Sequence, residues 1–396
     1  MANQLARQGK LEDIGGEIFL AELYASISTT VNIETWCGIV HEFSILRNMI
    51  NVCPESLMKY HDVEFDVKAL VDEIESKIYE VRNKNTKSDI IELSKGIVSE
   101  FRNVMNVVSR IEMDVEVCIP SGFPDLDRLV IGFKPGEMFV LAAHSSIGKT
   151  SLALNFIRNV ALRGIRRRPV AFFSLEMTAG QIIRRLLCTE AQIAETHFFD
   201  GEFRRSEMEK LTIAVEIYKK AKIFIDPTGG LTISELRAKA RRLKKMENIE
   251  LIVIDYLQLM HSGDKTENRQ QEFAEISGGI KKLAKDLAIP ILVLAQLTSE
   301  VGKTANASAR PKLSHLRESG AIGQDADIVA FLHRDRDDTK VNHNKEDMQK
   351  SVEASLIVEK NRNGQTGIVD LLFYPQRMEF VNESKFSAED YPPEIK

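Results

Sequence analysis

The sequence predicts an α/β protein in which a mainly parallel sheet flanked by helices follows a smaller all-helical region. Three observations support this fold class. The first roughly 110 residues show only helical periodicity, short β-rich apolar runs alternate with helical segments after Cys118, and a Gly-Lys-Thr tripeptide stands between an expected strand and an expected helix. We expect a helical domain over residues 1–83, a linker helix region over 84–114 and an α/β domain over 115–396.

In the helical region, apolar side chains recur at spacings of three and four residues. The last of these helices is expected from about residue 90 to residue 110, and its apolar stripe consists of Ile90, Leu93, Ile97, Phe101, Val104 and Val108. A helix between two domains needs cover for such a stripe, either from its own chain or from a neighbouring subunit.

The strands of the α/β domain are expected where short apolar runs are separated by helix-containing stretches. These runs are residues 138–142, 170–173, 223–225, 251–254, 291–294, 328–332 and 355–358. Ligands of a parallel sheet bind at the carboxyl ends of its strands, so we look for functional residues there.

A phosphate-binding loop is predicted after the first strand. Residues 143–150 (Ala-His-Ser-Ser-Ile-Gly-Lys-Thr) follow that strand and residues 151–161 favour a helix, which is the context that a P-loop requires. Lys149 can reach the β- and γ-phosphates of ATP, and the Thr150 hydroxyl can ligate Mg²⁺. Ala143 stands where the general pattern has its first glycine, and the tripeptide alone could be an ordinary helix start. The predicted ATP-binding set of the loop is Ser146, Ile147, Gly148, Lys149, Thr150 and Ser151.

Polar residues end three other apolar strands. Asp255 is expected to hold Mg²⁺ through its water shell, and Glu176 to orient and deprotonate the attacking water. Gln296 can bond to the γ-phosphate and report its loss to the loop that follows. Helix N-caps would explain either carboxylate, and a solvated strand end would explain the glutamine.

Composition sets broad limits. Of 396 residues, 43% are hydrophobic and 28% are charged, which excludes a disordered or collagen-like chain. No apolar run reaches about 18 residues and no secretory signal is recognisable, so we expect no membrane association. The four cysteines are widely spaced, which is typical of reduced thiols in a cytoplasmic protein. A net charge of −5 excludes a wholly basic surface but not a localised nucleic-acid site.

Several strings together resemble the hexameric replicative DNA helicases of the bacterial DnaB type. They are Ser121-Gly-Phe-Pro-Asp-Leu-Asp, the loop at 143–150, Ser174-Leu-Glu-Met, Ile254-Asp-Tyr-Leu-Gln-Leu, Glu267-Asn-Arg, Leu316-Arg-Glu-Ser-Gly, Gln324-Asp-Ala-Asp and Lys360-Asn-Arg-Asn-Gly. The match runs in order from about residue 115 to the C-terminus. A weaker match at 11–16 and 20–23 implies that the helical domain is a partial, shortened version of the family's N-terminal domain.

The resemblance implies a RecA-like ATPase core that works as a ring, with ATP at each subunit junction. Lys360, Asn361 and Arg362 match the family's basic segment that acts on a neighbour's γ-phosphate, and Arg185 matches an arginine that packs on the adenine. From the residues alone, Lys360-Asn-Arg-Asn-Gly could equally be a basic β-turn, because Asn-Gly is a strong hairpin signal. Arg185 could be a solvated helix residue.

The family resemblance also implies that single-stranded DNA lies in the central channel of the ring. Candidate DNA loops are residues 262–269 and 299–315, although both could be solvated polar loops. The candidate DNA-binding residues are Arg269, Lys303, Arg310, Lys312, Arg317, Glu318 and Gly320. The run Arg163, Arg166, Arg167 and Arg168 is expected to be a solvated face.

The chain departs from the family pattern at His144, Ser145, Gly278, Thr298 and Gly323, among other positions. None of these removes an ATP-site residue, so we expect hydrolysis to survive. Two of them remove positive charge near the DNA loops, which lowers the expected affinity for DNA.

The leading hypothesis is therefore an ATP-dependent replicative helicase, a homohexameric ring that encircles one strand and moves 5′ to 3′ by family resemblance, with primase and a helicase loader as possible partners. One alternative is a RecA-like ATP-switched protein that binds or remodels single-stranded DNA without unwinding. Another is a divergent copy that joins helicase rings as a structural subunit. A helicase–primase fusion is disfavoured, because the sequence has no zinc-binding cysteine cluster.

Overall fold

The computed structural model describes residues 118–164, 166–260, 269–297, 310–334 and 350–383, together with a few single helical positions between 16 and 105. Contacts divide the chain into two units, Met1–Ser99 and Glu100–Lys396. The domain boundaries expected near 83 and 114 lie outside the described residues, as does most of the predicted helical domain. Leu93, Ile97, Phe101 and Val104 of the predicted stripe are helical, and each exposes more than half of its surface.

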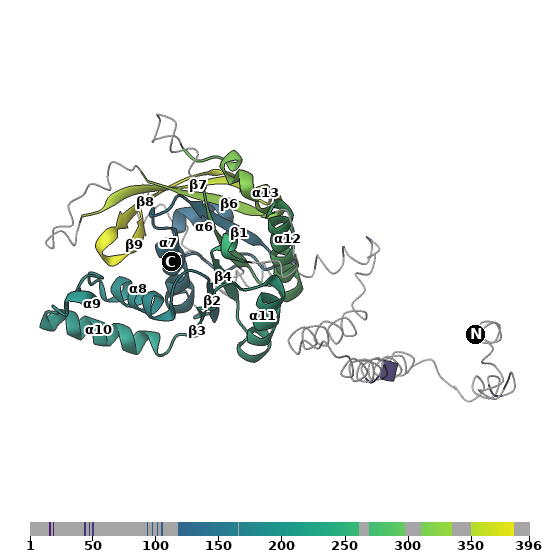
Figure 1. The fold of residues 1–396 in the computed structure, drawn as a ribbon, viewed down its shortest axis with the longest axis horizontal. Coiled ribbons are helices and arrows are strands. Elements are labelled where there is room, and N and C mark those ends of the chain that lie inside the picture. The colour runs from purple at the N-terminus through teal and green to yellow at the C-terminus, as the bar shows by residue number, and fades with distance from the viewer. Residues whose placement is uncertain are drawn as a thin grey trace, which may run out of the picture. The chain divides into compact units, whose positions relative to one another are not determined.

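The second unit is built on a nine-stranded sheet (Figure 1), with the order β3-β2-β4-β5-β1-β6-β7-β8-β9. The first six strands of this order, β3, β2, β4, β5, β1 and β6, are parallel to one another. Strands β7, β8 and β9 continue the sheet with antiparallel pairing. The strands are β1 Met138–Ala143, β2 Val170–Ser174, β3 Ile223–Asp226, β4 Leu251–Asp255, β5 Ile291–Gln296, β6 Ile328–His333, β7 Val352–Asn361, β8 Gly367–Tyr374 and β9 Glu379–Asn382. The predicted mainly parallel sheet is confirmed, and all seven predicted runs lie in strands.

The helices cover both faces of this sheet. They are α6 Pro124–Val130, α7 Lys149–Arg158, α8 Ala179–Ala191, α9 His197–Asp200, α10 Arg205–Tyr218, α11 Ile233–Glu247, α12 Arg269–Leu287 and α13 Gly320–Asp325. Short segments are the π-helix η2 Asn159–Arg163 and the 3₁₀ helices η3 Leu257–Leu259, η5 Leu313–Ser319 and η7 Pro375–Arg377. Capping boxes begin α8 at Thr178 and α11 at Thr232.

Alternate side chains of β1 enter two separate cores. Phe139 and Leu141 pack with α6, α7 and α8 on one face, whereas Met138 and Val140 pack with α11, α12 and α13 on the other. This alternation is the period of two expected of a strand. Because both faces are covered, the parallel strands are apolar throughout, which is why they were recognisable in the sequence.

The arginine run after α7 corrects one expectation. Arg163 and Arg166 are largely exposed, as predicted, but Arg168 is 7% exposed and its guanidinium pairs with Glu250. Arg168 lies just before β2, and the N–H of Glu250 donates to the Pro169 carbonyl at 2.8 Å. Because the chain enters the sheet at this point, the solvated-face prediction is wrong for Arg168.

Cys118 and Cys188 are free thiols, and burial raises the pKa of Cys188 to about 12. Within the part of the chain that the structure describes, no helix combines the length and apolar character needed to span a bilayer.

Replacing a central core side chain should destabilise the α/β unit strongly. Phe331 is 0% exposed in the middle of β6, so Phe331→Ala removes a large apolar side chain from a dense core and should cost about 3–5 kcal/mol of unfolding free energy. Ile368→Ala, on a residue 45% exposed, should cost about 1 kcal/mol or less. Urea denaturation followed by circular dichroism measures both, and equal shifts would contradict the described core.

Candidate functional site

The loop between β1 and α7 has a backbone shaped for an anion. Gly148 caps α7 with φ 107° and Ser146 has φ 67°, both in the left-handed region. A Cβ at Gly148 would also lie 3.1 Å from the Phe380 ring, so both conformation and space favour glycine here. Consecutive N–H groups of such a turn and of a helix N-terminus form a positive concavity that suits phosphate oxygens.

A cavity of about 740 Å³ lies over this loop, a volume in the range of small-ligand sites. The sequence-predicted residues that line it are Ser146, Gly148, Lys149, Thr150, Ser151, Glu176, Arg185 and Gln296, with His144 and Ser145 beside them. Ile147 is 5% exposed and its side chain belongs to the core, so only its backbone could face a ligand. Residues at the ends of β1, β2 and β5 thus meet at one edge of the sheet.

Asp255 lies beneath the cavity. Its Oδ2 accepts a hydrogen bond from the Thr150 hydroxyl at 2.8 Å, while its Oδ1 is buried without a hydrogen-bond partner. Burial raises the pKa of Asp255, an effect that Lys149 and Thr150 oppose. A hydroxyl beside a buried carboxylate is a hard oxygen pair of the kind that Mg²⁺ prefers.

Lys149 is partly desolvated in the cavity floor. Burial lowers the pKa of this lysine, and the carboxylates of Asp255 and Glu176 oppose the shift. Its Nζ lies 4.7 Å from the centroid of the Tyr256 ring, a cation–π contact that holds the ammonium next to Asp255. Among the described residues, no group of three or more His, Cys, Asp or Glu side chains could hold a metal ion.

The basic segment at the end of β7 is remote from this cavity. Arg362 pairs with Asp327 at 3.2 Å, and Asp327 Oδ2 in turn accepts from the N–H of Met138, the first residue of β1. The P-loop begins at Ala143, the last residue of β1, so five strand steps of about 3.3 Å, roughly 17 Å in all, separate the two places.

The neighbours of Arg362 are also held at this opposite edge. Lys360 Nζ donates to the carbonyls of Gly323 and Gln324 at 2.8 and 3.0 Å. Asn361 Nδ2 donates to the carbonyl of Leu129 at 3.3 Å. The β-turn that the sequence offered as the alternative reading of this segment is present, since β7 and β8 pair antiparallel across it.

The second wall of the cavity was missed from the sequence. It consists of Val352, Phe373, Pro375, Gln376 and Met378, together with the basic residues Arg334 and Lys350. The Arg334 guanidinium lies 5.1 Å from the centroid of Phe373. Arg334 directly follows a parallel strand, so the strand-end rule that found Glu176 could have found it. The apolar part comes from the antiparallel extension, whose one recognised motif, at 360–364, lies away from these residues.

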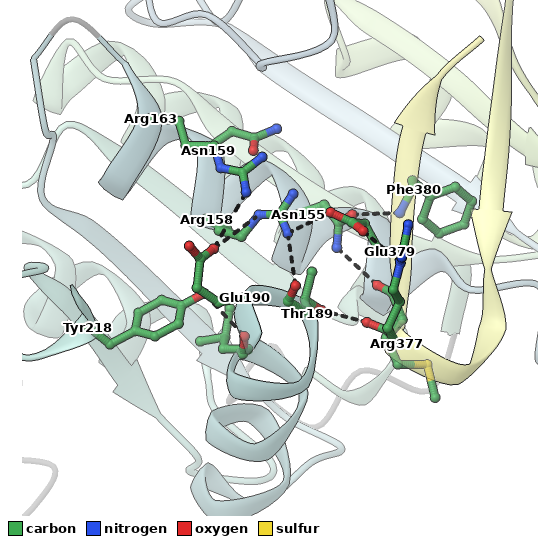
Figure 2. A network of polar contacts seen from close by, with 12 residues as sticks. Asn155, Arg158, Asn159, Arg163, Thr189, Glu190, Tyr218, Arg377, Glu379 and Phe380 are labelled. Carbon is green, nitrogen blue, oxygen red and sulfur yellow. Dashed lines mark hydrogen bonds and ion pairs between the residues drawn. The ribbon is translucent and has the colours of Figure 1, made fainter. Parts of the chain in front are cut away.

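Buried polar contacts fasten this wall to the helix that begins at the P-loop (Figure 2). The Asn155 amide of α7 donates to the Met378 carbonyl at 3.1 Å and accepts from the Phe380 N–H at 2.7 Å. Arg158, 2% exposed, pairs with Glu379 at 3.0 Å, and Glu379 also pairs with Arg377 at 2.8 Å. The second wall is therefore joined to α7 by buried polar contacts.

The candidate DNA residues are only partly described. Arg310 and Lys312 are exposed before η5. The side chains of Arg269, Arg317, Glu318 and Gly320 lie outside the described residues, as do Lys303 and Thr298 altogether. Gly278 and Gly323 have open space where a Cβ would stand, with no atom closer than 4.0 Å.

Comparison with known proteins supplies the family context. Residues 118–382 match the family described as DnaB-like helicase C terminal domain. The chain is 39% identical over 393 residues to the replicative DNA helicase DnaB of Geobacillus stearothermophilus, covering 98% of this chain and 84% of that protein. It is 38% identical over 395 residues to the replicative DNA helicase DnaC of Bacillus subtilis (strain 168), covering 99% and 84%.

A solved structure agrees. A DnaB-like replicative helicase, described with its interactions with primase, superposes with a TM-score of 0.70 at 29% identity, covering 96% of this chain and 86% of that one. Because the superposition spans nearly the whole chain, it includes the RecA-like ATPase core that carries the cavity and the P-loop.

The ion pair behind the second wall should behave as a coupled unit. Arg158→Met leaves the buried Glu379 carboxylate with one partner fewer and should cost about 3–5 kcal/mol of unfolding free energy. Arg158→Met combined with Glu379→Met removes both charges, so the double variant should be more stable than Arg158→Met alone. Urea denaturation of the three variants measures this. Strictly additive losses would show that the pair does not fasten the wall.

Proposed function

Because the chain belongs to the DnaB family of replicative DNA helicases, we propose that it encircles one DNA strand as a ring and binds ATP where two protomers meet. Family members are ATP-dependent DNA helicases, and this chain is one of them. The observation that carries the ring proposal is the strand-length separation between Arg362 and the P-loop of the same chain. A residue at that distance can complete only a neighbour's pocket.

Within one protomer, three side chains act on the phosphates or on the attacking water. Lys149 neutralises the β- and γ-phosphates, and its desolvation strengthens that interaction. Glu176 is an exposed carboxylate on the cavity wall, where it accepts a proton from the attacking water. Gln296 ends β5 at the cavity, where its side-chain N–H donates a hydrogen bond to the γ-phosphate.

Magnesium would be held by the Thr150 hydroxyl and, through water, by Asp255. When bound, it would neutralise phosphate charge and polarise the γ-phosphate. The Thr150 hydroxyl donates a hydrogen bond to Asp255, which leaves the lone pairs of the hydroxyl oxygen free to face a cation. The unpartnered Oδ1 of Asp255 supports this assignment.

Across the junction, the neighbour's Arg362 stabilises the charge that develops on the transferred phosphoryl group. Such a guanidinium contributes about 10³–10⁵ to kcat in comparable NTPases. Lys360 and Asn361 adjoin Arg362 on the same hairpin and complete the segment. Arg185, half-buried at the cavity rim, packs against the adenine.

Single-stranded DNA is gripped by its backbone. Arg269, Lys303, Arg310, Lys312 and Arg317 are proposed to contact phosphates, and Glu318 and Gly320 to adjoin the strand. Phosphate contacts carry no sequence information, as a motor that passes every sequence requires. Phosphate loss sensed at Gln296 would move the loop that follows and advance the strand in the 5′ to 3′ direction of the family.

Partners other than DNA are proposed from relatives. One superposed DnaB-like helicase is described with its interactions with primase, and we propose primase and a helicase loader as partners here. We propose the cytoplasm as its location, because the similar proteins are bacterial replicative helicases.

Unwinding of a forked duplex tests the function. Wild type should separate the strands with ATP, while Lys149→Ala and Arg362→Ala should each lose at least about 10³-fold of ATP hydrolysis and all measurable unwinding. Arg362→Ala should still bind nucleotide, because its own P-loop is intact; a fluorescent-nucleotide titration checks this.

An exposed matched control, Arg205→Ala on α10, should unwind like wild type. Wild type that hydrolyses ATP on single strands without separating the fork would contradict the proposal and favour a RecA-like DNA-binding or remodelling protein. Activity only when mixed with another helicase would favour a structural ring subunit.

A further inference from the structure

The side chain of Gln258 continues the sheet beyond the end of β4. Its Nε2 donates to the Gln296 carbonyl at 3.0 Å, and its Oε1 accepts from the Gln296 N–H at 3.3 Å. Backbone pairing of β4 with β5 ends at Ile254 and Val293. A primary amide presents a donor and an acceptor side by side, as a peptide group does, and so takes the place of a neighbouring strand.

Gln296 is thereby held on both sides. On its other side it is the register partner of Ala143, and the N–H of Leu297 donates to the Ala143 carbonyl at 3.0 Å. Ala143 begins the P-loop, whereas Gln258 lies three residues after Asp255. The end of β5 is therefore tied to the P-loop along one edge and to the Asp255 segment along the other.

The same pair of residues stands at the roots of both candidate DNA loops. Residues 262–269 begin four positions after Gln258, and residues 299–315 begin three positions after Gln296. Gln296 lines the nucleotide cavity, but Gln258 does not. A displacement of the Gln296 backbone on phosphate loss would reach the first loop through the two hydrogen bonds of the Gln258 side-chain amide.

We propose that Gln258 is a positioning residue that couples the γ-phosphate-sensing end of β5 to the root of the 262–269 loop. This role rests on the proposed function, which assigns both loops to DNA. Through this one side chain, the loop after β4 and the loop after β5 would respond together to the state of the nucleotide.

Hydrogen exchange measured by mass spectrometry on the full chain, without DNA, tests the coupling. In wild type, replacing Mg-ADP with Mg-ATPγS should change exchange in both 261–268 and 298–309. Gln258→Met keeps the side-chain volume and removes both bonds. The change in 298–309 should persist in this variant, while the change in 261–268 should fall about fivefold. Gln271→Met, an exposed glutamine on α12, should match wild type.

Two further measurements separate coupling from a merely structural role. Nucleotide affinity and basal ATP hydrolysis of Gln258→Met should stay within about twofold of wild type. Stimulation of hydrolysis by single-stranded DNA should fall about fivefold. Loss of nucleotide binding would show that Gln258 only supports the pocket and would overturn the proposal.

A wild-type exchange response in both segments of Gln258→Met, or a wild-type response confined to one segment, would also overturn it. Because the exchange measurement contains no DNA, it stays decisive even if wild type fails to unwind a fork, an outcome that would count against the proposed function instead.

Discussion

The six residues of β1 separate the P-loop at one end of the strand from the contacts of Arg362 at the other. A parallel sheet gathers the P-loop, Glu176, Asp255 and Gln296 at its carboxyl edge, because every strand that carries them runs in the same direction. The antiparallel return of β7 carries Arg362 to the opposite edge, where Asp327 holds it. The same topology that gathers most of a pocket within one chain therefore keeps Arg362 out of that pocket. This separation is why we propose that a neighbouring protomer supplies the arginine.

Low solvent access shifts the pKa values of the charged groups at the carboxyl edge of the sheet. Asp255 is 0% exposed, and burial raises its pKa while lowering that of Lys149. Both shifts have the same cause, because burial disfavours the charged form of each group. The second wall, which includes Pro375 and Gln376 of η7, closes this environment, and the contacts of Asn155 and Arg158 join the adjoining 378–380 segment to α7.

The sequence predicted the fold best where burial on both faces of the sheet makes whole strands apolar. The parallel strands were recognisable as continuous apolar runs, and the P-loop and the acidic strand ends followed from them. β8 was missed although Val369, Leu371 and Phe373 alternate as buried positions, and β9 is only four residues long. Arg168 looked solvated because its partner Glu250 is distant in sequence. Gln258 could not be found without knowing that β4 and β5 are neighbours, since its role depends on the backbone beside it.

Shared pockets make a complementation measurement the most direct test of the account. Lys149→Ala chains keep Arg362, and Arg362→Ala chains keep Lys149, so an equal mixture should assemble complete pockets at about a quarter of its junctions and recover ATP hydrolysis. Neither variant alone should hydrolyse ATP appreciably. A mixture that stays as inactive as its components although it forms mixed rings would contradict the account, as would an Arg362→Ala chain that hydrolyses ATP at the wild-type rate while monomeric.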